Sequence, residues 1–479
     1  MLFNSLEFAV FFPLVAILYF ASAPRFKTPL LLVASCAFYM AFIPAYILIL
    51  LVTILIDYFA GLYIPRFRGK RKRLLLLGSI FATCLVLFVF KYFNFFAGNF
   101  VSIAQWFHWP VSDFGMHVIL PIGLSFHTFQ SLSYVVEVYR GHQEPERDFT
   151  TYATYVMFFP QLVAGPIERP QNLLHQFHER HEFDHERIAS GLRRAGWGFF
   201  KKVVVADRLA IYVNDVYGSP LQYTGLQLTL GTVFFAYQIY CDFSGYSDIA
   251  IGTARVLGFK LMENFDTPYW SHSISDFWRR WHISLSTWFR DYVYFPLGGN
   301  RVSRLRWWTN LLVTFGVSGL WHGASWTFVI WGLLNGVYLV FGAIGRGLRN
   351  RALALIGLPE GGRLRQALQI LTTFALVCLG WTIFRARNMD DAWHILTHLH
   401  TGWGTSSLRT EHFLLRQLPV AVGGIVTLEV GQLINRRWPI SALVLRFPIG
   451  LRWAGYYALM MVILLLGIYR DTNFIYFQF

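Results

Sequence analysis

The feature that most constrains this chain is a series of apolar runs of roughly 20 residues, the length that a helix needs to cross a bilayer. Of its residues 55% are hydrophobic and 14% are charged, whereas a soluble domain carries about a quarter charged residues. Backbone groups within lipid must find partners inside their own segment, so spans of this kind are helical. The sequence therefore predicts an all-α polytopic membrane protein.

The basic residues indicate how the first five spans are oriented. The predicted spans are 8–23, 30–43, 46–64, 74–96 and 117–136. Arg25 and Lys27 follow the first span and a basic cluster at 66–73 follows the third, whereas 97–116 contains neither Lys nor Arg. Because Lys and Arg collect on the cytoplasmic side, we expect the N-terminus outside the cytoplasm. No Lys or Arg precedes Arg25, so the sequence lacks the basic start of a cleaved signal peptide, and we expect the first span to be retained.

The basic excess points to lipid as the partner. The chain has 41 Lys and Arg against 26 Asp and Glu, a net charge of +15. In a soluble protein this would suggest nucleic acid, but here the basic residues lie in short loops that fix topology and face anionic lipid. We therefore predict contact with the bilayer and no nucleic-acid binding. The four isolated cysteines indicate neither a disulfide framework nor a metal pair.

The middle of the chain departs from the pattern of clean spans. Segment 197–217 carries Lys201, Lys202 and Asp207 among apolar residues, which suggests a helix in the membrane interface. Segment 241–306 is too charged for ordinary spans and rich in aromatic residues. Since charged, irregular backbone at membrane depth needs surrounding protein or a water-filled cavity, we predict short or re-entrant helices there.

The domain prediction is a single membrane-embedded unit, 1–479. It comprises N-terminal helices at 1–150, a catalytic core with cavity-lining segments at 151–345 and C-terminal helices at 346–479. With the short helices counted, about 11–14 helices enter the membrane.

His322 is the most informative single residue. It lies between two apolar segments, and Gly319 and Gly323 beside it permit close helix approach or a break in the helix. A titratable residue in such a place is costly and is by default a functional candidate, and histidine can accept and return a proton near neutral pH. The alternative is a buried histidine that bonds a backbone carbonyl.

A second feature is the charged, aromatic segment 264–292. Among closely spaced Trp, Phe and Tyr residues it contains Asp276, Arg279, Arg280, His282, Arg290 and Asp291. Carboxylates and guanidinium groups can neutralise one another when buried, and arginines left over could hold the phosphates of a nucleotide-bearing donor. A purely structural ion-pair network remains the alternative.

These segments carry a resemblance to a known family. Residues 240–248, 276–292 and 319–323 resemble the signature of the membrane-bound O-acyltransferase (MBOAT) superfamily, and its bacterial alginate-acetylating branch is the closer match. Segments 121–126, 164–167 and 474–479 agree with that branch. The resemblance runs from the first residues to the last.

The resemblance implies a fold, an activity and partners. It implies a ring of helices around a central tunnel, in the inner membrane of a bacterial cell. It implies that an acetyl group passes from a cytoplasmic donor, acetyl-CoA or an acyl carrier protein, to the periplasmic side, with no bound cofactor. A periplasmic or membrane-anchored partner with an esterase-like fold then esterifies a polysaccharide such as alginate.

The resemblance makes His322 the catalytic residue. The supporting tunnel candidates are His282, Asn335, Asp242, Ser244, Asp276 and Arg279. Some relatives have a second histidine where this chain has Asn335, and asparagine can orient an acyl oxygen or a histidine tautomer but cannot act as a base. His282 is then the candidate second polar group, with bracing of the charged segment as its alternative role.

A histidine cluster at 175–185, formed by His175, His178, His181 and His185, is a candidate metal site. His178 and His181 are three residues apart, so they could share a helix face. The surrounding acidic and basic residues favour a solvated surface, and we predict no metal.

Two other functions compete with acetyl transfer. A transporter or channel would use intramembrane charge and predicts inverted repeats, which the sequence lacks. A scaffold of an exopolysaccharide export complex would keep the fold and tolerate loss of His322. Within the enzyme class, another envelope polymer such as peptidoglycan could be the acceptor.

Overall fold

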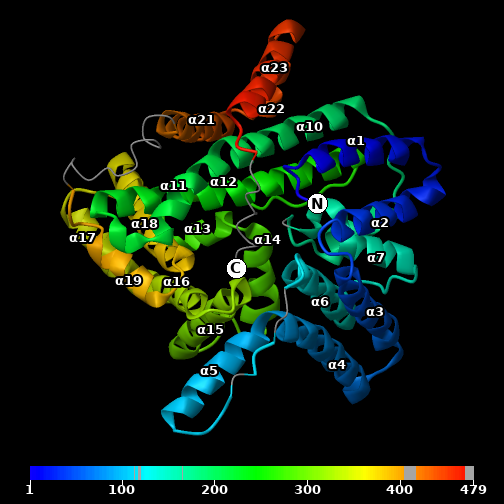
Figure 1. The fold of residues 1–479 in the computed structure, drawn as a ribbon, viewed down its shortest axis with the longest axis horizontal. Coiled ribbons are helices and arrows are strands. Elements are labelled where there is room, and N and C mark those ends of the chain that lie inside the picture. Colours follow the sequence, from blue (N-terminus) through cyan, green and yellow to red (C-terminus); the bar gives the residue numbers. More distant parts are fainter. Residues whose placement is uncertain (113, 117–119, 164, 404–416, 470–479) are drawn as a thin grey trace. The chain divides into compact units, whose positions relative to one another are not determined.

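The computed structural model describes residues 1–112, 114–116, 120–163, 165–403 and 417–469, and within these ranges it contains helices and no strands (Figure 1). This confirms the predicted all-α class. The chain groups into two compact units, one formed by Met1–Ala195 with Ser247–Met262 and the other by Gly196–Tyr246 with Glu263–Phe479. The three-part division predicted from sequence stays a prediction.

The first unit is built from the N-terminal helices. Its main helices are α1 (Leu6–Ala21), α2 (Pro24–Met40), α3 (Tyr46–Tyr63), α4 (Gly69–Leu87), α5 (Phe93–Trp106), α6 (Leu124–Arg140) and α7 (Phe149–Met157). Helix α3 packs against α4 and α6, and α2 packs against α7. The short helices α8 (Phe159–Leu162), α9 (Pro170–Leu173) and η3 (Leu174–His178) follow. Helices α10 (His185–Phe199) and α12 (Gly225–Leu257) run through both units.

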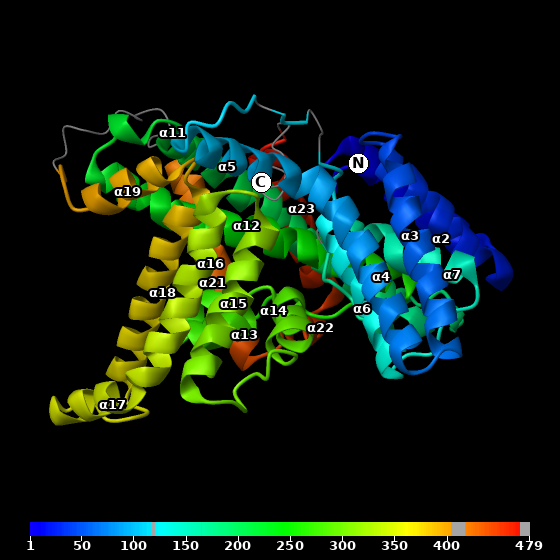
Figure 2. The same cartoon turned by 90° about the horizontal axis from the view of Figure 1, so that it is seen from below.

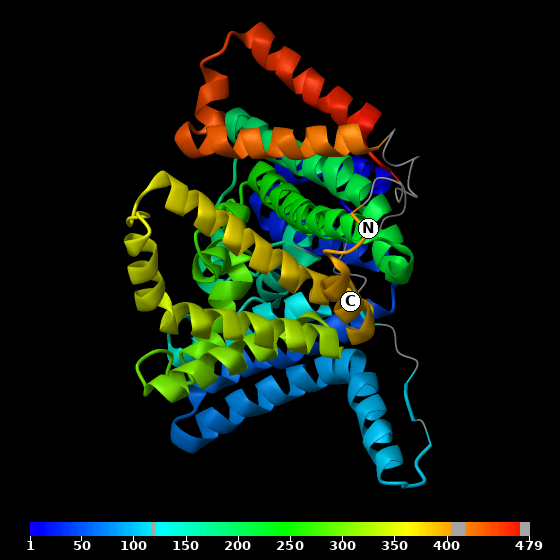
Figure 3. The same cartoon turned by 90° about the vertical axis from the view of Figure 1, so that its left-hand side faces the viewer.

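The second unit contains pairs of long helices joined by short ones. It includes α11 (Asp207–Gly218), α13 (Ile274–Arg280), α14 (Ile283–Phe289), α15 (Arg304–His322), α16 (Trp326–Ile344), α17 (Arg346–Leu355), α18 (Arg363–Arg385), α19 (Met389–His398), α21 (Leu418–Arg437), α22 (Ile440–Leu445) and α23 (Ile449–Leu466). Figure 2 shows α17 joining the ends of α16 and α18. Figure 3 shows α22 joining α21 to α23.

Six helical segments among the described residues are long and apolar enough to cross a membrane. They are Tyr46–Arg66, Gly69–Trp106, Trp326–Ile344, Arg363–Arg385, Leu418–Arg437 and Ile449–Leu466. The shorter α1 is also apolar. These segments lie along the whole chain, which confirms a multi-pass membrane protein.

The fourth span, predicted at 74–96, is longer in the structure. Helix α4 continues through a π-helical turn, Phe88–Tyr92, into α5, so the helical stretch Gly69–Trp106 extends into the predicted loop 97–116. The loop was placed by its lack of basic residues, which marks the side of a membrane but does not end a helix. The fifth span, predicted at 117–136, begins as α6 at Leu124, and residues 117–119 lie outside the described part.

The charged segments 197–217 and 241–306 form three kinds of structure. Helices α13 and α14, seven residues each, confirm the prediction of short helices. The start of the same segment, however, belongs to the 33-residue α12. The π-helix Phe200–Ala206 is buried rather than exposed at an interface, because Asp207 and Asp242 neutralise Lys202 inside the protein.

Candidate active site

The site is built on two helices that approach each other through glycine. A Cβ atom at Gly319 of α15 would lie 2.2 Å from the carbonyl oxygen of Phe328, and one at Gly332 of α16 would lie 2.2 Å from that of Phe315. Real Cβ atoms never come that close, so both positions require glycine. Small residues of this kind allow membrane helices to pack backbone to backbone. The contact holds the last turn of α15 against α16.

His322 is the last residue of α15 and lies buried in an aromatic cage. The chain leaves the helix at Gly323 in an extended conformation. The imidazole ring centroid lies 4.9 Å from the ring of Trp321, 5.0 Å from that of Trp331 and 5.6 Å from that of Phe384. All three rings meet it nearly edge-on, so the histidine is surrounded by apolar surface.

A layer of tryptophans supports this cage. The rings of Trp331 and Trp381 stack at 5.8 Å with an interplanar angle of 15°, and Trp281 lies 5.0 Å from Trp381. Phe328 packs edge-on against Phe384 at 4.9 Å. Such a surround excludes water and strengthens any electrostatic interaction inside it.

His282 is also fully buried, and its hydrogen bonds indicate its tautomer. Its backbone adopts φ 44°, an uncommon left-handed conformation, at the start of α14. Its Nδ1 lies 3.1 Å from Oδ1 of Asn264, which also accepts from the amide and hydroxyl of Ser284 at 3.2 and 2.9 Å. An amide oxygen can only accept, so His282 donates from Nδ1 and presents Nε2 as the acceptor nitrogen.

The two histidines belong to one site. The ring of Trp321 lies 4.9 Å from that of His322 and 6.5 Å from that of His282. Both imidazoles therefore pack near the same indole ring. The predicted pair is therefore brought together, and Asn264 and Ser284 orient the His282 imidazole.

Asn335 forms hydrogen bonds with two tryptophans at the aromatic cage. Its Oδ1 accepts from Nε1 of Trp278 at 3.2 Å, and its Nδ2 donates to the carbonyl oxygen of Trp331 at 2.8 Å. Asn335 thus holds two tryptophans, of which Trp331 contacts His322. These bonds give Asn335 a positioning role in the cage.

Asp242 and Ser244, both on α12, face buried lysines. Oδ1 of Asp242 lies 2.7 Å from Nζ of Lys202, and the hydroxyl of Ser244 accepts from Nζ of Lys201 at 3.3 Å. The residue between them, Phe243, meets His282 edge-on at 4.5 Å. Helix α12 therefore presents its aromatic residue to the histidine and its polar residues to the lysines.

Asp276 and Arg279 lie away from the aromatic cage. Oδ1 of Asp276 accepts from Nε of Arg280 at 2.9 Å and Oδ2 accepts from the amide of His272 at 3.1 Å, so the carboxylate braces the start of α13. Partial burial favours a higher pKa for Asp276, but the bonds from Arg280 and His272 hold its pKa below the usual value. The side chain of Arg279 is exposed.

The histidines at 175–185 form separate contacts. His178 pairs with Glu146 at 2.7 Å, His175 lies 3.6 Å from Glu179, and His181 is buried with Nε2 2.8 Å from the carbonyl oxygen of Gln176. Among the described residues no three His, Cys, Asp or Glu side chains gather as metal ligands would.

Sequence reasoning did not assign the residues that orient and enclose the histidines. Asn264 lies 18 residues before His282, and the hydrogen bond between them follows from no periodicity. Phe384 is still more distant in sequence from His322. The signal available was the density of Trp and Phe in the segments around both histidines.

Comparison with known proteins agrees with this architecture. The sequence model of the MBOAT, membrane-bound O-acyltransferase family matches residues 142–353. The chain is 39% identical to a probable alginate O-acetylase of Azotobacter vinelandii, over 89% of this chain and 85% of the relative. A probable alginate O-acetylase of Pseudomonas aeruginosa is 41% identical over 82% and 74%. A peptidoglycan O-acetyltransferase of Helicobacter pylori is 35% identical over 79% and 74%.

The identity extends well beyond the segment that the family model matches, and it covers both units of the structure. The chain belongs to the membrane-bound O-acyltransferase family and is a multi-pass membrane acyltransferase.

Proposed function

We propose that this protein moves an acetyl group from a cytoplasmic donor across the inner membrane for O-acetylation of an extracellular polysaccharide, with His322 as the catalytic residue. The observation that carries the proposal is the pair of buried imidazoles, His282 and His322, in one aromatic site. The high identity to probable alginate O-acetylases supports acetyl as the group and alginate or a similar polymer as the acceptor.

His322 acts as the general base in this proposal. An acceptor hydroxyl attacks the carbonyl carbon of the donor thioester while His322 takes the hydroxyl proton. The tetrahedral intermediate collapses, the ester forms and the thiolate leaves, and His322 returns the proton to the sulfur. A correctly placed general acid–base group contributes about 10²–10⁴-fold in rate.

His282 supports this step from a fixed tautomer. Asn264 accepts from Nδ1, so Nε2 is the acceptor nitrogen of the His282 imidazole. In this role His282 orients the acceptor hydroxyl or the imidazole of His322, depending on which of them it contacts in the reactive complex. Its burial makes that hydrogen bond stronger than it would be in water.

Acetyl-CoA is the proposed donor, with an acyl carrier protein as the alternative. Arg279 on α13 is exposed, and its guanidinium group is suited to a phosphate of either donor. A periplasmic or membrane-anchored esterase-like partner then places the acetyl group on the polymer. The tunnel expected from the family resemblance would join the two sides.

The test is polymer-linked acetyl ester in cells that express the protein with its cognate partner. Ester is measured as base-released acetate, separately in exopolysaccharide and in purified peptidoglycan, with and without the gene. Acetate gained in exopolysaccharide supports the proposal. Acetate gained in peptidoglycan favours the second candidate, which the Helicobacter pylori relative supports. Acetate gained in neither fraction contradicts both and favours a scaffold or transporter.

A further inference from the structure

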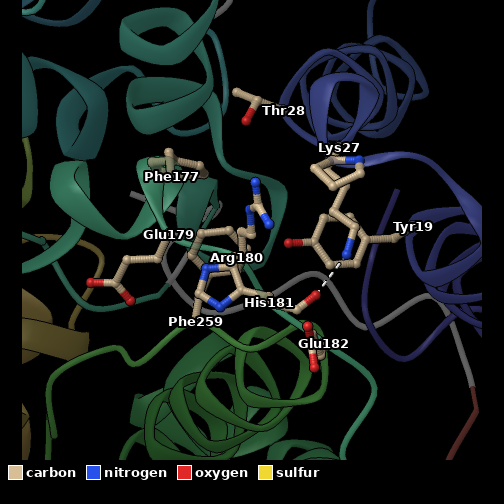
Figure 4. Close-up of a pocket in the computed structure, with 10 residues that line it drawn as sticks. Tyr19, Lys27, Thr28, Phe177, Glu179, Arg180, His181, Glu182 and Phe259 are labelled. Carbon is tan, nitrogen blue, oxygen red and sulfur yellow. Dashed lines mark hydrogen bonds between the residues drawn. The ribbon is translucent and has the colours of Figure 1, made fainter.

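The first unit contains a small cavity that the proposed function does not use. It has a volume of about 120 Å³ and lies between the turn from α1 to α2 and the segment that follows η3 (Figure 4). Its lining residues are Tyr19, Pro24, Lys27, Thr28, Phe177, Glu179, Arg180, His181, Glu182 and Phe259. One water molecule takes about 30 Å³ in the liquid, so the space suits a group of roughly four oxygen atoms.

Three donor groups converge on this cavity. Tyr19 is 1% exposed, and Figure 4 draws its hydroxyl pointing toward the guanidinium group of Arg180. No hydrogen bond to this hydroxyl forms within the described part of the chain. Nζ of Lys27 donates to the carbonyl oxygen of His181 at 2.6 Å and lies 4.9 Å above the Tyr19 ring, which leaves two of its N–H groups for a ligand.

The lining contains two carboxylates, Glu179 and Glu182, besides these two cations. Figure 4 shows the carboxylate of Glu179 pointing away from the Tyr19 hydroxyl. Glu179 also lies 3.6 Å from His175. Burial lowers the pKa of His181, so its imidazole is neutral at pH 7. Lys27 and Arg180 are the cations on the Tyr19 side of the cavity, where they favour an anion.

The position of the cavity indicates the kind of anion. The topology predicted from basic residues puts the end of α1 and the start of α2 on the cytoplasmic side, where lipid headgroups lie. The apolar residues Leu14, Ile17 and Leu18, which precede Tyr19 on α1, are exposed. A buried tyrosine hydroxyl and a lysine with an apolar stem are typical of this depth.

We propose that this cavity binds the phosphate of a phospholipid headgroup through Tyr19, Lys27 and Arg180, with the acyl chains along α1. The bound lipid fixes the turn between α1 and α2 to the segment after η3. The interaction is independent of acetyl transfer.

Native mass spectrometry of the delipidated, detergent-solubilised protein tests the proposal. Dihexanoyl phosphatidylglycerol and inorganic phosphate are titrated separately against wild type and against Arg180→Gln, which removes an exposed charge and should fold. Arg68→Gln is the matched control, because Arg68 is an exposed arginine of the same unit outside the cavity. Tyr19→Phe tests the buried hydroxyl.

The expected result is saturable binding of the lipid to wild type and to Arg68→Gln, weakened about tenfold by Arg180→Gln, as loss of a charge-assisted contact predicts. Tyr19→Phe should weaken it less. Equal binding by wild type and Arg180→Gln would overturn the site. Binding of inorganic phosphate as tight as that of the lipid would overturn a lipid as the source of the phosphate.

Discussion

Two clusters of the second unit bury titratable side chains, and they accommodate them in different ways. In the lysine cluster, Nζ of Lys202 lies 2.8 Å from Asp207 and 2.7 Å from Asp242, so full charges neutralise one another. In the imidazole pair, His282 and His322 are surrounded by aromatic rings, and the hydrogen bond from His282 goes to a neutral amide.

This difference indicates that the lysine cluster supports the fold, whereas the imidazole pair is suited to proton transfer. Charges held by salt bridges in a dry interior keep their protonation state, because changing it would strand a partner. A neutral imidazole in an apolar cage can accept a proton when a reaction supplies one, and gives it back when the site resets. The account therefore predicts that the first cluster governs folding and the second governs the rate of reaction.

Removing the shared lysine should have the largest effect. Lys202→Met leaves Asp207 and Asp242 buried without their cation, and breaking a buried pair costs about 3–5 kcal/mol. We expect little folded protein in the membrane, measured by fluorescence-detected size exclusion and thermal stability. Lys260→Met, at an exposed lysine, is the control and should change neither. A stable Lys202→Met protein would show that the cluster does not support the fold.

Separating α15 from α16 should disturb the second cluster through the backbone. Gly319→Ala places a Cβ 2.2 Å from the Phe328 carbonyl oxygen, whereas Gly342→Ala on α16 meets nothing within 4 Å. Overpacking of this kind costs about 1–3 kcal/mol. We expect Gly319→Ala to lose both stability and acetyl transfer, and Gly342→Ala to keep both. Full activity in Gly319→Ala would mean that the close contact does not position His322.

The orientation of His282 can be tested without changing the histidine. Asn264→Ala removes the acceptor that fixes the Nδ1 proton, and Asn264→Asp restores an acceptor at the same place. General acid–base groups contribute about 10²–10⁴-fold to the rate. We therefore expect kcat to fall by at least about tenfold in Asn264→Ala and to be restored in Asn264→Asp. An equal loss in both variants, with equal loss of thermal stability, would assign Asn264 to packing.

The smallest effect is expected at the edge of the cage. Trp278→Phe removes the hydrogen bond to Asn335 but keeps the aromatic contacts with Phe315 and Trp331. One neutral hydrogen bond contributes about 0.5–1.5 kcal/mol. A modest drop in melting temperature with nearly unchanged kcat is the expected outcome. A large loss of kcat would place Trp278 in the reaction rather than in its support.

Local features of the molecule could be predicted from the sequence, whereas contacts between different segments could not. Apolar runs identify spans because length and composition are local properties, and the glycines beside His322 marked the histidine for the same reason. The salt bridge of Lys202 with Asp242 and the bond between Asn264 and His282 join residues on different segments of the chain, and no periodicity carries that information. The end of α5 at Trp106 was missed because a lack of charge orients a segment without terminating its helix.

The central claim is that His322 performs acetyl transfer, and the most direct measurement is polymer-linked acetyl ester in cells that express wild type, His322→Ala or His322→Gln. Membrane levels are matched by immunoblot. The account predicts that ester falls to the level of cells without the gene while the protein remains in the membrane. Ester at the wild-type level in either variant would contradict it and make His322 a structural residue.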